Sequence, residues 1–173
     1  MSGSLQYSLL SKKKIFPVWF MRQAGRYLPE YQKIRKKNKN FINFCLNIND
    51  ATKVSLQPIK RFDLDAAIVF SDILLILNAI GQKVEFKEKT GPILKNYNLN
   101  KFYKTNDKIF IKKLKNVYKI LKKIKKTLPK EKSLIGFAGS PWTLLTYMIN
   151  KGSPKKNIKL LKNLKKKRSN KNN

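Results

Sequence analysis

The segment Pro17-Val18-Trp19-Phe20-Met21-Arg22-Gln23-Ala24-Gly25-Arg26-Tyr27-Leu28-Pro29-Glu30-Tyr31 joins an apolar run to two closely spaced arginines. The apolar run, residues 16–21, stops at Arg22, and Arg26 follows after Gln-Ala-Gly. Pro29 suits the first position of a helix, because its missing N–H would have no partner there. The pattern predicts a buried strand at residues 16–20, then a loop that presents two guanidinium groups, then a helix.

Two guanidinium groups on one loop indicate an anionic ligand. Arginine binds carboxylates through paired hydrogen bonds and keeps its charge at every physiological pH. Charge spacing alone also allows another interpretation, in which Arg22 and Arg26 are ordinary surface residues. Short motifs of this kind have a high false-positive risk, so spacing by itself leaves both interpretations open.

Longer stretches of the sequence resemble the uroporphyrinogen decarboxylase family. The first is Arg-Gln-Ala-Gly-Arg-Tyr-Leu-Pro-Glu-Tyr at residues 22–31, and the second is Phe-Ser-Asp-Ile-Leu at residues 70–74. The third is Gly-Phe-Ala-Gly-Ser-Pro-Trp-Thr-Leu at residues 136–144, which runs on to Thr-Tyr-Met at residues 146–148. The resemblance covers about residues 16–152. It implies a cofactor-free decarboxylase of haem biosynthesis. Such an enzyme removes CO2 from the acetate side chains of uroporphyrinogen III and so gives coproporphyrinogen III.

The resemblance also implies roles for individual residues. Substrate binding falls to Arg22, Gln23, Ala24, Gly25 and Arg26, with the two arginines holding carboxylates of the substrate. Asp72 would be the catalytic residue and would also bind the substrate, accepting hydrogen bonds from pyrrole N–H groups. Tyr147 would donate a hydroxyl hydrogen bond to a substrate carboxylate or to Asp72.

Simpler structural roles remain open for two of these residues. Asp72 follows an apolar run and precedes Ile73, so its carboxylate is also suited to cap a helix. Tyr147 lies in a segment with helical character, where a half-buried aromatic side chain is ordinary.

Composition restricts the chemistry. The chain of 173 residues has no histidine and one cysteine, Cys45, so no intrachain disulfide or cysteine metal cluster can form. The resemblance implies a reaction without a metal or an organic cofactor, and the absence of histidine is compatible with that. Neither a signal peptide nor a membrane span is predicted, because every apolar window is short or interrupted by polar residues, and a cytoplasmic protein is expected.

The formal net charge of +31 raises the question of nucleic-acid binding. Lysine far outnumbers arginine, and asparagine and isoleucine are also abundant, a mixture that A/T-rich codons would produce without selection for a ligand. The lysines are not interleaved with aromatic residues in the way a base-stacking surface requires. No specific nucleic-acid function is therefore predicted.

Buried runs alternate with helical patterns along the chain, which indicates an α/β fold with a parallel sheet. Strands are predicted at residues 16–20, 66–70 and 133–138, and a hairpin from residue 84 to just beyond residue 91. Helices are predicted at residues 29–35, 41–46, 49–61, 73–80, 107–128 and 143–150. Within the 49–61 helix, Asn49 or Asp50 is the expected cap and Pro58 predicts a kink or an early stop.

Three strands are too few for a complete (β/α)8 barrel, which the resemblance implies as the family fold and which takes about 250 residues. The expected fold is a partial (β/α)8 TIM barrel of roughly three βα units. Its expected divisions are a flexible lead-in at residues 1–15, a decarboxylase-like domain at 16–152 and a lysine-rich tail or helix at 153–173.

The expectation is a truncated chain, inactive alone or dependent on a separately encoded C-terminal half. The resemblance implies a homodimer for the full enzyme. The alternative is a non-catalytic basic fragment or half-barrel subunit that binds anionic partners.

Overall fold

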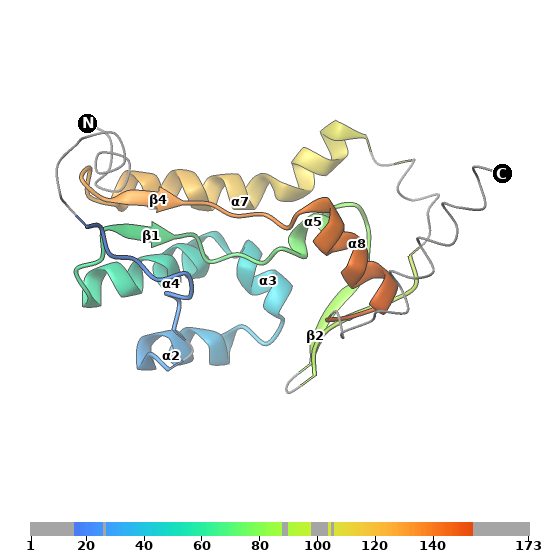
Figure 1. Cartoon of the computed structure of the whole chain (residues 1–173), viewed down its shortest axis with the longest axis horizontal. Helices are drawn as coiled ribbons and strands as arrows, with labels where there is room; N and C mark the ends of the chain where they lie inside the picture. Colours follow the sequence, from blue (N-terminus) through green and yellow to red (C-terminus); the bar gives the residue numbers. More distant parts are fainter. Residues whose placement is uncertain (1–15, 26, 88–89, 98–103, 105, 154–173) are drawn as a thin grey trace.

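The computed structural model describes residues 16–25, 27–87, 90–97, 104 and 106–153 (Figure 1). These residues form a mixed α/β arrangement with two short sheets. The elements, in chain order, are α2 (Pro29–Lys37), α3 (Phe41–Leu46), α4 (Ile48–Arg61), β1 (Ala66–Ile68), α5 (Leu75–Ala79), β2 (Val84–Lys87), β3 (Gly91–Leu94), α7 (Asp107–Thr127), β4 (Ser133–Ile135) and α8 (Pro141–Asn150).

Polar side chains cap the N-termini of α3, α4, α7 and α8. Asn40 accepts a hydrogen bond from the Asn43 amide at the start of α3, and Asn106 does the same for the Ile109 amide of α7, both at 2.9 Å. α4 is capped by Asn47, which accepts from two amides, so the prediction that Asn49 or Asp50 is the cap was wrong by two or three residues. α4 also continues through Pro58 to Arg61, and the predicted early stop is wrong.

β1 and β4 pair in parallel, with Ala66 opposite Ser133 and Ile68 opposite Ile135. α4 and α7 pack against one another, and α4 also contacts β1, so the helices form a layer beside this sheet (Figure 1). β2 and β3 form a separate antiparallel hairpin, as predicted. The hairpin is tied to the end of α8, because the Leu94 amide donates to the Lys151 carbonyl at 2.9 Å.

The predicted three-stranded parallel sheet was wrong in detail. Residues 16–20 form no strand, and Phe16 is 85% exposed rather than buried. Their link to the sheet is made at Val18, which exchanges hydrogen bonds with Asp65 just before β1. The other two strands are three residues long, and β4 is half-buried along its length. Their parallel pairing is as predicted, so of the three apolar runs only the first did not form a strand.

The core lies between the helices and β1. Phe44 on α3 is fully buried, and its ring centroid is 4.6 Å from that of Phe70 and 6.1 Å from that of Tyr31. α7 adds Ile120 and Ile124, both at most 1% exposed. The predicted helix at residues 107–128 is confirmed, and the apolar residues along one side of it, which form its stripe, pack in the core.

Candidate functional site

Because β1 and β4 are parallel, their carboxyl ends meet at one edge of the sheet. The chain beyond β1 is held there by two hydrogen bonds. The Val69 amide donates to the Ile135 carbonyl at 3.0 Å, and the Phe70 amide donates to the Ser55 hydroxyl at 2.8 Å. Ser55 lies on α4 and is 1% exposed, so a helix side chain sets the path of the backbone that leads to Asp72.

The arginine-bearing loop is attached to β1 by Gln23. Its Nε2 donates to the Ala66 carbonyl at 2.5 Å, and its Oε1 accepts from the Ile68 amide at 3.0 Å. Gln23 is 4% exposed, so its amide takes the place of a neighbouring strand along β1. The sequence prediction placed Gln23 among substrate-binding residues, whereas in the structure both ends of its side chain are engaged with the backbone.

Close packing fixes the shape of this loop. A Cβ added at Gly25 would lie 2.7 Å from the ring of Tyr27, so a larger residue would displace that ring. Arg22, on the same loop, is exposed. Arg26, the second predicted guanidinium, lies outside the described residues.

One cavity brings the predicted residues together. Its volume is about 760 Å³, and it is lined by Arg22, Gln23, Ala24, Gly25, Asp72 and Tyr147, together with apolar residues. These residues come from the loop before α2, the segment after β1, and α8. Asp72 follows β1 and Tyr147 follows β4, as the sequence predicted, whereas no strand precedes the loop that carries Arg22.

Asp72 is partly buried in this cavity. Its Oδ1 accepts a hydrogen bond from the Leu74 amide at 2.8 Å, within the turn just before α5. The cap position of α5 is Leu74, which has no side-chain hydrogen bond, so Asp72 does not cap this helix. Burial raises the pKa of the Asp72 carboxyl above its ordinary value, and the Leu74 hydrogen bond opposes that shift only in part. The hydrogen bond to Leu74 is compatible with the cavity-lining position, because it uses one carboxylate oxygen.

Tyr147 reaches the cavity from the helix that follows β4. Ser140 caps α8, and Gly139 before it allows a tight approach, since an added Cβ would lie 2.7 Å from Leu144 Cδ2. Tyr147 is half-buried, and within the described part of the chain no hydrogen bond joins its hydroxyl to Asp72. The two side chains share the cavity without direct contact through a hydrogen bond.

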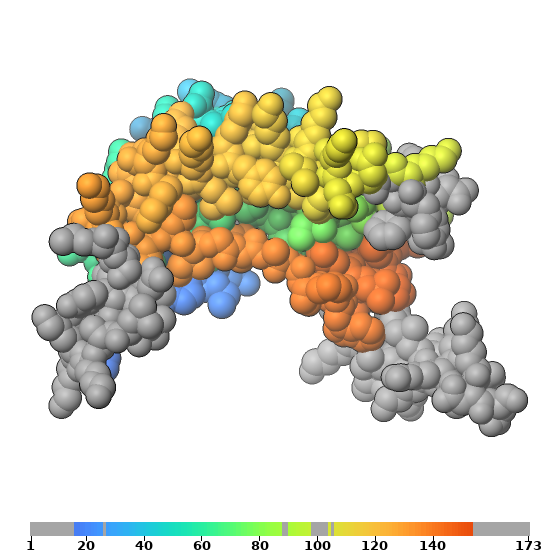
Figure 2. Space-filling view, turned by 90° about the horizontal axis from the view of Figure 1, so that it is seen from above, coloured from blue at the N-terminus to red at the C-terminus, as the bar shows by residue number. Residues whose placement is uncertain are grey.

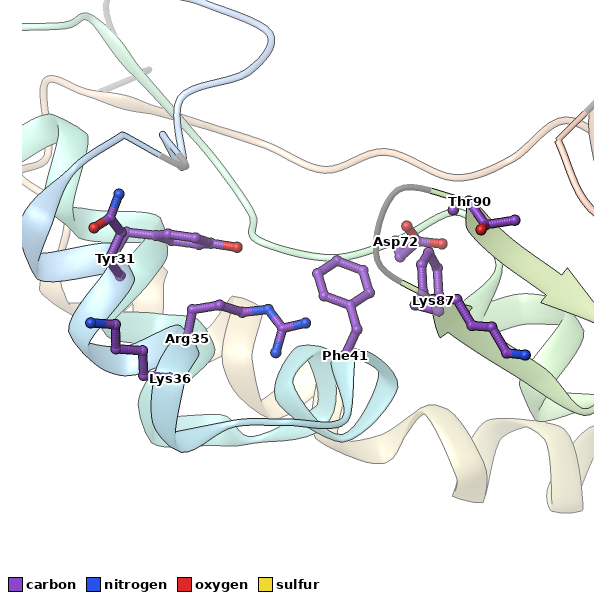
Figure 3. Close-up of a pocket in the computed structure, with 10 residues that line it drawn as sticks. Tyr31, Arg35, Lys36, Phe41, Asp72, Lys87 and Thr90 are labelled. Carbon is purple, nitrogen blue, oxygen red and sulfur yellow. The ribbon is translucent and has the colours of Figure 1, made fainter.

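A second hollow, of about 660 Å³, opens on the other side of Asp72. Figure 3 shows Arg35 and Lys36 of α2 on one side of it, Lys87 and Thr90 of the hairpin on the other, and Phe41 between them. The Arg35 guanidinium lies over the Phe41 ring, 5.8 Å from its centroid, and donates to the backbone carbonyl of Asn38. Asp72 therefore lines both cavities.

Sequence reasoning missed Ser55 and Arg35 in this neighbourhood. Ser55 could have been noticed as a hydroxyl among apolar residues of a helix. Arg35 could have been noticed as a cation close to the arginine loop. No group of three metal-ligating side chains occurs within the residues the structure describes.

A carboxylate and a guanidinium around an apolar-walled cavity at the end of parallel strands define a site for a partly apolar anion in an α/β protein. The family model described as uroporphyrinogen decarboxylase (URO-D) matches residues 7–171, and the chain belongs to that family. The match extends beyond residues 16–152 on both sides, and the predicted division into lead-in, domain and tail stays a prediction.

Three relatives carry the name uroporphyrinogen decarboxylase. The chain is 55% identical to the one from Rickettsia felis over 146 residues, which are 84% of this chain and 42% of that protein. For the proteins from Rickettsia canadensis and Rickettsia bellii the identities are 56% and 53%, with 84% of this chain and 43% of each relative covered. The chain therefore spans about four-tenths of the length of these relatives. Over the described residues, none of the helices has the length and apolar character needed to cross a membrane.

Proposed function

We propose that this chain provides one part of a uroporphyrinogen decarboxylase, a carboxy-lyase that removes CO2 from the acetate side chains of uroporphyrinogen. The proposed fold is a part of a (β/α)8 barrel, in which β1 and β4 are two of the parallel strands. The observation that carries the proposal is the shared cavity of Arg22, Asp72 and Tyr147 at the carboxyl ends of β1 and β4, the edge where barrel enzymes place their sites.

The chemistry of the reaction suits this set of residues. Loss of CO2 from an acetate arm leaves an electron pair that needs an acceptor. A pyrrole protonated on a ring carbon is a cationic iminium and accepts that pair itself, so the macrocycle supplies the electron sink. A carboxylate held beside the ring stabilises the cation as it forms, which is electrostatic preorganisation.

Asp72 is proposed as that carboxylate. One oxygen is fixed by the Leu74 amide, so the side chain does not need to reorganise when the substrate cation forms. The raised pKa of Asp72 also favours proton uptake and return near the ring more than the pKa of an exposed aspartate would.

Arg22 and Arg26 are proposed to bind the substrate carboxylates, and Tyr147 to donate a further hydrogen bond. Paired guanidinium contacts would orient the reacting arm relative to Asp72. Gln23 is proposed to act by holding this loop against β1, so that its contribution is positioning.

The chain alone is expected to be inactive, because it covers about four-tenths of its relatives' length and leaves the cavity open to solvent. Turnover is expected when the missing part is supplied as a second polypeptide. A homodimer of the completed unit and a location in the cytoplasm are parts of the same proposal.

The test is a decarboxylation assay with uroporphyrinogen III, using the full chain co-expressed with the unmatched part of the Rickettsia felis relative. Asp72→Asn keeps the volume of the side chain and an oxygen that can accept from the Leu74 amide but removes the charge, and should lower kcat at least about 100-fold, about 2.7 kcal/mol of barrier. Asp63→Asn is the matched control, because Asp63 is exposed and paired with Lys132 away from the cavity. Equal turnover in the Asp72→Asn complex and the wild-type complex would refute the role of Asp72.

A further inference from the structure

The exposed face of α7 carries a regular row of lysines. Each lies two residues before a member of the apolar stripe that runs from Phe110 to Leu128. Two residues correspond to about 200° around a helix, so this row is on the side of α7 directly away from the core. We define the lysine ridge as the exposed residues Lys108, Lys112, Lys115, Lys119, Lys122 and Lys126.

The charge of the lysine ridge is extended and is not balanced locally. From Lys108 to Lys126 the helix rises about 27 Å. Asp107, in the first turn, is the only acidic residue of α7. The ion pairs of the described residues use Arg61, Lys83 and Lys132, and none of them involves the ridge. Like charges three and four residues apart repel one another, so a row of negative charge outside the helix would relieve an existing repulsion.

Packing of α7 holds the ridge in one place. Ile120 and Ile124 are at most 1% exposed, and α7 contacts α3, α4 and α5. Figure 2 looks onto the side of the molecule that α7 crosses. The described residues that line the cavity around Asp72 include none from α7. A partner bound along the ridge would therefore contact residues that have no part in the proposed decarboxylation.

One border of the ridge is occupied by neighbouring helices. Lys123 Nζ donates to Asn49 Oδ1 of α4 at 2.6 Å. Asn116 Nδ2 donates to the Leu46 carbonyl at the end of α3 at 3.0 Å. The major groove of duplex DNA, about 12 Å wide, admits a single helix, and α3 and α4 beside α7 would obstruct its entry. The ridge is therefore better suited to a flat anionic surface than to a groove.

The opposite border carries two exposed apolar side chains. Ile111 is 53% exposed and Tyr118 is 51% exposed, and they are seven residues, or about two turns, apart along the same side of the helix. An aliphatic and an aromatic side chain next to lysines suit the boundary between lipid headgroups and acyl chains. A single aromatic residue does not form the row that base stacking requires.

We propose that the lysine ridge binds the surface of a membrane that contains anionic phospholipids. Such surfaces attract clusters of about four to eight basic residues, and the ridge supplies a cluster of that size on one helix face. The ammonium groups contact lipid phosphates, while Ile111 and Tyr118 lie at the level of the headgroups. The inference goes beyond the proposed function and does not depend on it.

Cosedimentation of the full chain with vesicles is the first test. Vesicles of equal parts phosphatidylglycerol and phosphatidylcholine should bind the chain at about 0.1 M salt and release most of it at about 1 M, because salt screens the contact. Vesicles of phosphatidylcholine alone should bind little. Absence of binding to the anionic vesicles, or equal binding to both kinds, would overturn the inference.

Matched substitutions in the full chain locate the surface. The ridge variant carries Lys112→Gln, Lys115→Gln and Lys119→Gln, and should bind the anionic vesicles at least about thirtyfold more weakly. The control variant removes the same charge from exposed positions of α2 and α4 and should lose less than about threefold. It carries Lys33→Gln, Lys37→Gln and Lys60→Gln. Equal losses in the two variants would show that net charge alone decides, and would overturn the inference.

A fluorescent label reports which face meets the lipid. Cys45, the one cysteine of the chain, is 1% exposed, so Tyr118→Cys provides a single accessible site for an environment-sensitive fluorophore. Phe20→Cys is the control, because Phe20 is 61% exposed and residues 16–25 run on the side of β1 away from α7 (Figure 1). Emission should shift to the blue on anionic vesicles at position 118 and stay unchanged at position 20. Equal shifts at both positions, or a shift at position 20 alone, would contradict the proposal.

Two other sources of binding are separated by the same assay. A variant with Lys159→Gln, Lys162→Gln and Lys165→Gln removes charge from the lysine-rich segment that lies outside the described residues. A loss as large as that of the ridge variant would assign the binding to that segment. Duplex DNA that binds more tightly than the vesicles and depends equally on the ridge would assign the ridge to nucleic acid. Either result would overturn the inference.

The decarboxylation assay distinguishes this inference from the proposed function. The ridge variant, completed by the missing part of the enzyme, should turn over uroporphyrinogen in solution as fast as the wild-type complex. Vesicle binding that depends on the ridge, in a complex without turnover, would refute the proposed function and leave the membrane contact standing. Circular dichroism of each variant verifies that the helices are intact.

Discussion

The helical side of the molecule and its cavity side are held together by different kinds of contact. On the helical side, Phe44, Ile120 and Ile124 are buried completely or nearly so in a continuous apolar core. On the cavity side, the loop and the segment beyond β1 are positioned by single polar side chains, Gln23 and Ser55, while large apolar residues are left exposed. We therefore expect folding stability to be concentrated in the helices, while the cavity side leaves apolar surface exposed.

The largest expected effect lies in the helical core. Phe44→Ala would remove a fully buried ring that contacts Tyr31 and Phe70, and should lower the free energy of unfolding by about 3–5 kcal/mol. Phe20→Ala on the cavity side, where the ring is 61% exposed, should change it by less than about 0.5 kcal/mol. Urea unfolding of both variants measures the contrast, and similar losses would show that the two sides are equally structural.

A smaller effect is expected where a helix side chain holds the cavity wall. Ser55→Ala would leave the Phe70 amide without its partner and should cost about 1–3 kcal/mol. Thr52→Ala is the control, because the Thr52 hydroxyl donates only to Ile48 within its own helix, and its loss should cost less. If the two variants lost the same free energy of unfolding in urea titrations, the hydrogen bond from the Phe70 amide to Ser55 would contribute no more than a hydrogen bond within the helix.

The loop contact can be separated from global stability. Gln23→Ala removes both hydrogen bonds to β1 and should cost about 1–2 kcal/mol of unfolding free energy. In the completed enzyme it should raise KM for uroporphyrinogen more than it lowers kcat, because it frees the arginine loop. A fall in kcat at unchanged KM would point to a direct role in the reaction.

The pH dependence of stability should have opposite signs on the two sides. Burial raises the pKa of Asp72 in the folded state, so its contribution is fully present below the ordinary value of 3.8 and is lost as the pH rises through the folded pKa. Asp72→Asn should therefore be more stable than the wild type at pH 7 and lose that advantage in acid. Thermal unfolding from pH 3 to pH 7 gives the comparison, and an advantage that grew in acid would contradict it.

Glu30 on α2 should change the pH dependence of stability in the opposite direction to Asp72, and we expect its effect to be the smallest. Its own backbone amide, and then Arg61 through a 3.0 Å ion pair, lower the pKa of Glu30 in the folded state. Its contribution is present above the ordinary value of 4.5 and is lost as the pH falls through the folded pKa. Glu30→Gln should be slightly less stable than the wild type at pH 7, and salt should reduce the difference because the pair is exposed. A difference independent of salt would argue against the ion pair as its cause.

The helices and the cavity-lining residues were accessible from the sequence because their determinants are local. The stripe of α7 and the proline at the start of α2 can be read within one or two turns, and Asp72 and Tyr147 lie in motifs that the resemblance identified. The cap of α4 at Asn47 was missed because three neighbouring residues, Asn47, Asn49 and Asp50, can all accept from a helix amide.

The predicted strands at residues 66–70 and 133–138 and the hairpin were found, although the two parallel strands are shorter than predicted. The strand at residues 16–20 could not be judged from the sequence, because a strand depends on partners elsewhere in the chain. Residues 16–20 are apolar enough for a buried strand, yet their exposure is set by which segments lie beside them. The role of Gln23 was hidden for the same reason, since its two partners on β1 are more than forty residues away in sequence. Hydrogen bonds across such separations leave no periodic signal.

The bridges made by Gln23 and Ser55 also mean that two amide hydrogens of one short segment are protected by different parts of the molecule. The Ile68 amide depends on the arginine loop and the Phe70 amide on α4. Exchange with deuterium at these two sites would therefore report on loop opening and helix separation independently. The exchange rates of these two amides would therefore show whether the arginine loop or α4 separates first from the segment after β1.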